Sequence, residues 1–294
     1  MCKTFLVQAL KMLFVAMAVL MSGMSVAQVN SESNPVRAPL RFLITFDDGP
    51  SGAKRFNATK KVLNALKSNS IQPDIKAVFF TQTRAARGGG TEVGQLLLQR
   101  EFTEGHLLAF HSSTKRHSNH RFLTPNEFDE SLKNGIADLT AVCGVAPRLV
   151  RPPFWSFDAR TLATYHQHGL QMLLTDLSAN DGVIWGVNWS WHKHSNFLKQ
   201  LTLARKKWLG GEMPIVNGVT PIVVTFHDVN NYTARNVEVY LNILLQVAHE
   251  LEMPVSEKPF YDDRNEIEIA ALARTMSDAN TEFFLPGIWS WLWK

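Results

Sequence analysis

Side chains that can bind a metal ion or transfer a proton recur in this sequence directly after runs of apolar residues. Carboxylate and imidazole groups are common metal ligands, and both act as acids and bases. Asp-Asp-Gly-Pro at 47–50 is also favourable turn chemistry, so that stretch alone would be weak evidence. Core packing alone would rarely place such residues at the ends of several separate apolar runs. The residues concerned are Asp47, Asp48, His111, Arg151, Asp176, His227 and Asp228.

The apolar runs that precede these residues are typical of strands buried on both faces of a parallel sheet. Because the carboxyl ends of parallel barrel strands converge on one face, we expect the polar residues to meet there. The predicted strands are Arg41–Phe46, Lys76–Thr81, Leu107–Phe110, Arg148–Arg151, Gln171–Asp176 and Pro221–Phe226.

Helical patterns lie between these strands. Residues 124–127 form a capping box with proline at the first helical position. Asp158 can cap a helix that stops at Gly169, and Val237–Leu251 is a long apolar helical pattern. The alternation of strands and helices predicts an α/β fold, a single (β/α) barrel with about seven parallel strands instead of the usual eight.

The first 27 residues have the features of a signal peptide. Lys3 and Lys11 give a positive start, residues 12–24 form an apolar run, and residues 25–27 match a small-x-small cleavage site. The apolar run is short for a membrane span. We therefore expect an exported protein, periplasmic or secreted, without stable membrane insertion after cleavage. An uncleaved anchor is the alternative.

The remaining chain divides into three parts. Residues 28–40 are polar and contain prolines, which predicts a linker. Residues 41–255 would form the barrel. Residues 256–294 would be a C-terminal extension that packs on the barrel, with a last strand and a helix.

The charge of the mature chain is nearly balanced. Removal of residues 1–27 takes away two lysines and no acid, which leaves 28 basic and 26 acidic residues, or +2. With no basic run, this argues against a nucleic-acid partner. The mature chain keeps Cys143 alone, so no internal disulfide can form, and we expect a small buried residue there. We expect a monomer.

Three motifs resemble those of the polysaccharide deacetylase family, also called the NodB-homology domain or carbohydrate esterase family 4. Thr45–Pro50 (TFDDGP) resembles the family signature, Arg151–Phe154 its third motif and Val223–Asp228 its fifth. They occur in the family's order and span roughly residues 41–230. The resemblance implies a distorted NodB-like barrel. It also implies a metal-dependent hydrolase that removes acetyl groups, with N-acetyl favoured, from a cell-envelope or extracellular polysaccharide.

The resemblance also implies roles for individual residues. Asp48 would bind the metal with two histidines and leave a position open for water, which suits Zn²⁺, with Co²⁺ or Ni²⁺ as alternatives. Asp47 would be the general base, held ionised by Arg151. His227 would protonate the departing amine. The backbone N–H near Phe154 would help to stabilise the oxyanion.

The second motif departs from the family pattern, in which the metal histidines stand four residues apart. His111 provides the first, but position 115 is lysine. The second family histidine commonly lies about seven residues before the helix cap, and seven residues before Thr124 is His117. We therefore predict a two-residue insertion with His111 and His117 as ligands. His120, or a lost ligand, is the alternative.

The fourth motif is also altered. The family's aspartate pair corresponds to Asp176 and Asp181, and Gly182 replaces the aromatic residue that follows. One of the two aspartates would orient His227 and raise its pKa. Asp181 is favoured by motif position and Asp176 by its place at a strand end.

Candidate residues for sugar binding lie in and after the third motif. Pro153 and Phe154 belong to it, Trp155 follows it directly, and Trp185 and Trp189 belong to the tryptophan-rich run that begins at Gly182. These tryptophans could stack on sugar rings, or they could close the side of the barrel.

Two other functions remain open from the residues alone. A hydrolase of a small non-sugar amide could use the same fold, since the second and fourth motifs are altered. A non-catalytic glycan-binding module is the third possibility. The presence of Asp47, Asp48, Arg151 and His227 argues against a decayed site, because a binding module needs no acid–base pair.

Overall fold

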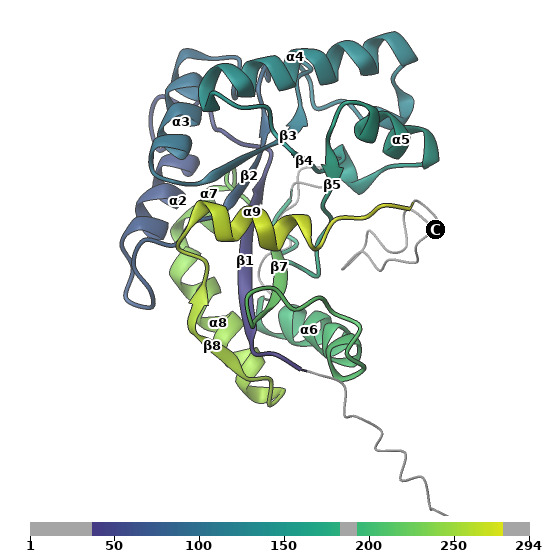
Figure 1. The fold of residues 1–294 in the computed structure, drawn as a ribbon. Helices are drawn as coiled ribbons and strands as arrows, with labels where there is room; N and C mark the ends of the chain where they lie inside the picture. Colours follow the sequence, from purple (N-terminus) through teal and green to yellow (C-terminus); the bar gives the residue numbers. More distant parts are fainter. Residues whose placement is uncertain (1–36, 183–192, 279–294) are drawn as a thin grey trace, which may run out of the picture. The chain divides into compact units, whose positions relative to one another are not determined.

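The computed structural model describes residues 37–182 and 193–278, and its central element is strand β1 (Figure 1). All residues of β1 (Leu40–Asp47) are buried. It pairs in parallel along its whole length with β7 (Thr220–His227), and near its carboxyl end with β2 (Val78–Gln82). Its amino-terminal part also pairs with β8 (Val255–Phe260). Residues buried on both faces explain the continuous apolar runs in the sequence.

The sheet has the strand order β5-β4-β3-β2-β1-β7-β6, with β8 beside β1. Its further strands are β3 (Leu107–Ser112), β4 (Leu149–Val150), β5 (Gln171–Met172) and β6 (Leu177–Ser178). All pairings between these strands are parallel. This confirms the distorted barrel of about seven parallel strands.

The strand predicted over Gln171–Asp176 is shorter in the structure, and a separate short strand follows it. Residues 171–172 pair with β4, and residues 177–178 pair with β7 at the other end of the strand order. The chain therefore crosses from one edge of the sheet to the other between β5 and β6. Within the described residues no strand pairing joins β5 to β6, so the barrel has an open seam there.

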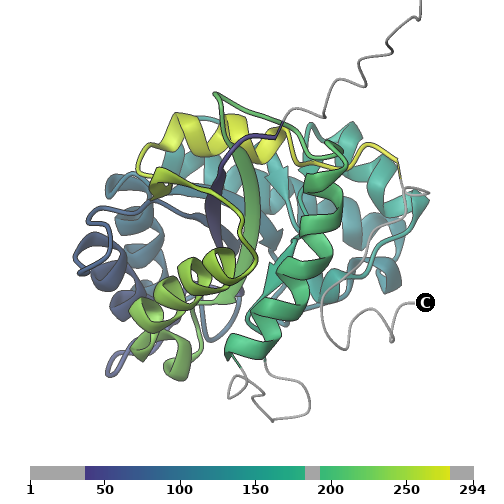
Figure 2. The same ribbon diagram turned by 90° about the horizontal axis from the view of Figure 1, so that it is seen from below.

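Helices surround the strands (Figures 1 and 2). The predicted capping box is confirmed: Thr124 accepts from the N–H of Glu127, whose carboxylate accepts from the N–H of Thr124. Asp158 caps the next helix, and Gly169 beyond its end has φ 75°. The helices are α2 (Ala58–Lys67), α3 (Glu92–Thr103), α4 (Pro125–Cys143), α5 (Ala159–Gln167), α6 (Lys193–Leu209), α7 (Asn231–Arg235), α8 (Val237–Glu250) and α9 (Arg264–Leu272), with 3₁₀ turns η1 (His120–Phe122) and η2 (Pro153–Trp155).

The amino-terminal ends of the strands are covered by α9 and the residues before it. Arg41 on β1 forms ion pairs with Asp262 and Glu266, and the N–H of Lys76 donates to the carbonyl of Tyr261. Ile267, Ala270 and Ala271 of α9 pack with Leu43, Val78, Phe80, Ala109, Leu149, Leu173 and Val223 from the strands. This end of the barrel is therefore closed by apolar packing and ion pairs.

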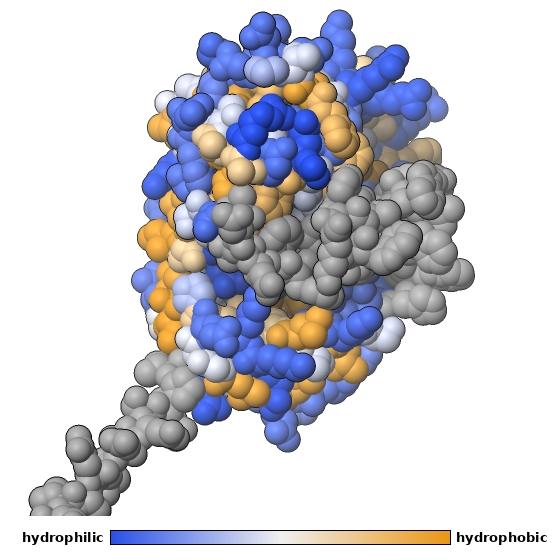
Figure 3. Space-filling model, turned by 90° about the vertical axis from the view of Figure 1, so that its right-hand side faces the viewer, coloured by the Kyte–Doolittle hydropathy of each residue, from blue (hydrophilic) through white to orange (hydrophobic). Residues whose placement is uncertain are grey.

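The described surface is of mixed polarity. On the face shown in Figure 3, hydrophilic and hydrophobic residues are interspersed, and hydrophilic ones gather at its upper end. Among residues 37–182 and 193–278, no helix has the length and apolar character needed to cross a bilayer. Cys143, in the last turn of α4, is half-buried against the core. The expected signal peptide and most of the expected linker lie outside the described residues.

Candidate active site and metal centre

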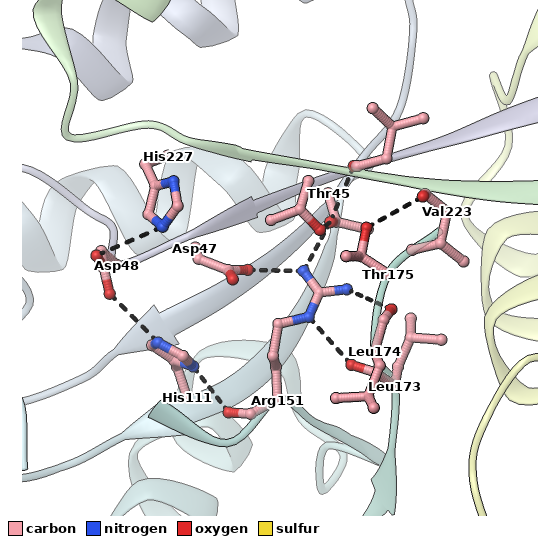
Figure 4. A network of polar contacts seen from close by, with 12 residues as sticks. Thr45, Asp47, Asp48, His111, Arg151, Leu173, Leu174, Thr175, Val223 and His227 are labelled. Atoms are coloured by element: carbon pink, nitrogen blue, oxygen red, sulfur yellow. Dashed lines mark hydrogen bonds and ion pairs between the residues drawn. The ribbon is translucent and has the colours of Figure 1, made fainter. Parts of the chain in front are cut away.

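The polar residues that follow the strands meet at the carboxyl end of the barrel (Figure 4). Asp47 ends β1 and Asp48 follows it; His111 lies in β3, and His227 ends β7. Arg151 follows β4 directly. Parallel pairing of β1 with β7 sets Asp47 opposite His227 in register. The fold thus brings side chains that are up to 180 residues apart in sequence to one place.

Three of these side chains could hold a metal ion. Asp48, His111 and His117 each offer a ligand atom, and the three atoms lie within 4.8 Å of one another. Asp48 Oδ1 is 3.2 Å from His111 Nε2 and 3.5 Å from His117 Nε2, and the two Nε2 atoms are 3.1 Å apart. Ligands at roughly 2.1 Å from a tetrahedral Zn²⁺ are about 3.4 Å apart. The donor set and its spacing therefore fit such an ion.

Neighbouring groups orient these three side chains. The Nδ1–H of His111 can donate to the carbonyl of Arg151 at 2.7 Å, which leaves its Nε2 lone pair directed at the site. The His117 ring stacks on Phe154, with centroids 4.4 Å apart. Gln82 Nε2 donates to Asp48 Oδ1 at 2.9 Å. Asp48 itself has φ 73°, an uncommon backbone conformation for aspartate.

The electrostatics of these residues favour the forms that bind metal. Burial would raise the pKa of Asp48, but His117, His111 and His227 nearby hold it well below its usual range. Burial lowers the pKa of His117 to about 4 against the opposing effect of Asp48. A carboxylate and a neutral imidazole are the protonation states that metal binding requires.

The second carboxylate, Asp47, is buried against Arg151. Nη1 of Arg151 donates to Asp47 Oδ1 and to Thr45 Oγ1, both at 2.7 Å. Its Nε and Nη2 donate to the carbonyls of Leu173 and Leu174, both at 3.0 Å. These two carbonyls lie between β5 and β6, so the guanidinium occupies the open seam of the barrel and also fixes the carboxylate.

His227 is paired with Asp181. The distance from Nδ1 to Asp181 Oδ1 is 2.8 Å, and Asp181 Oδ2 accepts from the N–H of His227 and from Thr233 Oγ1. Burial alone would lower the pKa of His227, but Asp181, with Asp48 and Asp47 beyond it, raises that pKa to about 10. Asp181 therefore favours the protonated form of the His227 imidazole, whose Nε2 lies 3.9 Å from Asp48 Oδ2.

Asp176, the other predicted support for His227, lies elsewhere. It forms an ion pair with Arg274 and accepts from the N–H of Val223. The structure therefore places Asp181, and not Asp176, against the imidazole. At Gly182 an added Cβ would lie 3.1 Å from the His227 ring, so the backbone of this residue passes close to the imidazole.

His120, the alternative ligand, is a core residue. It is fully buried, its Nδ1 is 2.7 Å from the Tyr165 hydroxyl, and its ring stacks on Phe110 and packs against Phe128. Burial lowers its pKa well below the usual value. The structure thus brings His117, and not His120, to Asp48, as counting back from the helix cap predicted.

The third motif forms a strained turn beside the site. Phe154 and Trp155 both have φ 59°, a conformation that costs a residue with a side chain about 1–3 kcal/mol. Pro153 and Trp155 are buried, and Trp155 packs over the Arg151 guanidinium. Phe154 is half-buried against His117. Trp185 and Trp189 lie outside the described residues.

Two residues of the site were not predicted from the sequence. Gln82 is a polar residue at the end of an apolar strand, so the signal that identified the other residues could also have identified it. Thr233, in α7, donates to Asp181 and carries no comparable signal in the sequence.

The parallel (β/α) barrel thus holds an Asp-His-His cluster beside the buried Asp47 and the paired His227. Within it, residues 38–173 match the family model for polysaccharide deacetylases. This match and the relatives described next confirm the resemblance that the motifs predicted, and they support the assignment of the enzyme class as a deacetylase.

Individual relatives agree with this assignment. A peptidoglycan-N-acetylglucosamine deacetylase of Bacillus cereus is 26% identical over 251 residues, which cover 80% of this chain and 81% of that protein. A chitin deacetylase of Pestalotiopsis sp. is 28% identical over 143 residues, 49% of this chain and 44% of that protein. The solved family 4 carbohydrate esterase of Streptomyces lividans, in complex with acetate, shares the fold. Its TM-score is 0.50 at 21% identity, covering 76% of this chain and 95% of that one.

Proposed function

We propose that this chain is an exported, metal-dependent deacetylase that removes acetyl groups, with N-acetyl favoured, from a cell-envelope or extracellular polysaccharide. The observation that carries the proposal is the convergence of three ligand atoms within 4.8 Å, from Asp48, His111 and His117, beside an aspartate and a histidine that are each held by a partner of opposite charge. The relatives named above supply the class of substrate.

Asp48, His111 and His117 would hold the ion, with Zn²⁺ favoured and Co²⁺ or Ni²⁺ as alternatives. When bound, such an ion supplies a Lewis acid that polarises the acetyl carbonyl and lowers the pKa of a coordinated water. The remaining steps belong to the protein's own side chains.

Asp47 would act as the general base. As the water oxygen bonds to the acetyl carbon, a carboxylate oxygen of Asp47 takes the water proton. Arg151 keeps this carboxylate in place through its 2.7 Å contact. The N–H of Phe154, in the strained turn beside His117, would donate to the oxygen that gains negative charge.

His227 would act as the general acid. Its Nε2 donates a proton to the nitrogen or oxygen of the sugar as the bond to the acetyl carbon breaks, which releases acetate and the free amine or hydroxyl. Asp181 stabilises the protonated imidazole on the opposite ring nitrogen, as an aspartate does in a catalytic triad. Phe154, Trp185 and Trp189 remain proposed sugar-contacting residues, whereas the burial of Pro153 and Trp155 limits them to supporting the turn.

The test is acetate release from a panel of acetylated glycans, measured with metal-loaded protein and after removal of metal with a chelator. We expect release that is lost with the metal and restored by Zn²⁺. Release of ammonia or a small acid without acetate would indicate a non-sugar amide hydrolase. Glycan binding without turnover, unchanged in Asp47→Asn, would indicate a binding module.

Export is tested separately. Expression of the full chain in a Gram-negative host, followed by fractionation and amino-terminal sequencing, should give a periplasmic or secreted protein that starts near Gln28.

A further inference from the structure

Three loops at the carboxyl end of the barrel are basic, and apart from the proposed metal ligand Asp48 they contain no acidic residue. They follow β1, β2 and β3 and span residues 48–57, 83–91 and 112–119. The six basic residues on them are all exposed: Lys54, Arg55, Arg84, Arg87, Lys115 and Arg116. We call these six residues the basic rim.

Hydrogen bonds join the three loops in a row. The N–H of Gly52 donates to the carbonyl of Arg87 at 2.9 Å, and the N–H of Ala86 donates to that of Lys115 at 3.1 Å. Lys115 and Arg116 directly precede His117, so their Cα atoms lie within about 8 Å of that of a proposed metal ligand. The basic rim is therefore one continuous border beside the candidate metal site.

Most of this charge has no counter-ion among the residues that the structure describes. Arg84 is neutralised by Asp138, which accepts from Nε at 2.7 Å and from Nη2 at 2.8 Å. The other five residues form no ion pair with any residue of the ranges 37–182 and 193–278. Five unneutralised cations at one edge are notable in a chain whose formal charge is only +4.

The first loop is held in a fixed shape that presents its basic residues outward. Asn57 is buried, and its Nδ2 donates to the carbonyls of Ser51 and Ala53 at 2.8 and 2.9 Å. Between these anchors, Phe56 has φ 53° and is 82% exposed, next to Arg55. An exposed aromatic ring beside cations offers an apolar face to a sugar ring and positive charge to its acidic substituents.

From this arrangement we infer that the substrate is an acidic glycan, an acetylated polysaccharide with carboxylate or phosphate groups along its chain. The five unpaired cations of the basic rim contact these anions while the acetyl group lies at the metal site. This inference rests on the proposed deacetylase function. Because the cations are exposed, their effect depends strongly on ionic strength.

The experiment compares three acetylated substrates of equal acetyl content: a uronic acid polymer, a phosphate-bearing glycan and neutral chitin oligomers. For metal-loaded full-length protein at low salt, we expect kcat/KM to be about tenfold higher on one or both acidic substrates than on the neutral one. The preference should shrink as salt rises. The two acidic substrates distinguish carboxylate from phosphate.

Substitutions in the basic rim test whether the preference for acidic substrates arises there. Lys54→Gln/Arg55→Gln and Lys115→Gln/Arg116→Gln should each lower the ratio of kcat/KM on acidic to neutral substrate several-fold. The matched control, Lys206→Gln/Lys207→Gln, removes two exposed cations from α6 and should leave this ratio as in the parent protein. Binding of the deacetylated acidic polymer, measured without turnover, should weaken in the first two variants alone.

The results separate this inference from the deacetylase proposal. Acetate release at equal efficiency from acidic and neutral glycans, with a ratio that the rim variants do not change, would overturn the acidic substrate and leave the deacetylase in place. Tighter binding to anionic vesicles or DNA than to the acidic polymers would overturn it too. No acetate release from any substrate would refute the deacetylase itself.

Discussion

Charge is arranged differently at the two ends of this barrel. At the amino-terminal end Arg41 is matched by Asp262 and Glu266, and Arg148 by Glu268. At the carboxyl end, imidazoles surround a carboxylate at distances that suit a shared ion, and five of the six residues of the basic rim lack counter-ions among the described residues. Charges that neutralise each other stabilise a fold, whereas charges directed at open space are available to a ligand.

The largest effect expected at the carboxyl end comes from loss of a metal ligand. His117→Ala should abolish stoichiometric metal binding and reduce deacetylation to background, because two ligands remain where three are needed. Metal content by mass spectrometry and acetate release measure this.

His120→Ala is the matched control for this substitution. It should keep the metal and most activity while the free energy of unfolding falls by roughly 2–5 kcal/mol, since it empties a packed core position. Loss of metal in His120→Ala, with metal retained in His117→Ala, would show that the ligand assignment is wrong.

Asp181→Asn should lower kcat by about 10²–10⁴-fold with the metal retained, because the imidazolium of His227 loses its counter-ion.

The same substitution should also change how the free energy of unfolding of the metal-free protein depends on pH. The pKa of His227 is raised from 6.5 to about 10. The contribution of the protonated imidazole to the free energy of unfolding is therefore complete below pH 6.5 and is lost as pH rises towards 10. Urea unfolding from pH 6 to 10 should show a smaller decline in the variant. Identical pH profiles would contradict the coupling.

Gln82→Leu should weaken metal binding about 10–100-fold, because Asp48 loses the donor that orients its ligand oxygen. At saturating Zn²⁺ most of the activity should return.

The control lies at the amino-terminal end of the barrel. It is Gln72→Leu, which removes two hydrogen bonds to the backbone of Phe260. It should reduce stability without changing the dissociation constant for Zn²⁺ measured with a competing chelator. Equal affinities for Zn²⁺ in the two variants would count against an orienting role for Gln82.

The smallest effect is expected from Glu266→Gln at the amino-terminal end. Its ion pair with Arg41 is half-exposed, and Arg41 keeps Asp262, so the free energy of unfolding should fall by about 0.5 kcal/mol. Steady-state kinetics should not change. A clear loss of kcat/KM would contradict the separation of the two ends.

The sequence was sufficient to predict most strands and the convergence of the residues proposed to bind the metal. Apolar runs buried on both faces predicted six strands, and the chemistry at their ends predicted where Asp48, His111 and His227 would meet. His117 was found by its distance from the helix cap at Thr124. These predictions need only local information, because the carboxyl ends of strands in a parallel barrel converge regardless of loop conformation.

Other features depend on contacts that no local pattern carries. One strand was predicted over residues 171–176, yet only residues 171–172 pair with β4, and residues 177–178 pair with β7 after the chain crosses the seam. Asp176 and Asp181 are both plausible partners for His227, and the position of α7 favours Asp181. The basic rim is assembled from three short segments about 30 residues apart, so no basic run exists in the sequence.

Arg151 has a consequence for how this site can change during evolution. One guanidinium both holds the proposed base and closes the backbone across the gap between β5 and β6. A descendant that no longer needed the reaction would still need this cation in order to fold. Loss of function would therefore be recorded first at His117, because Asp47 is the counter-ion of the buried Arg151.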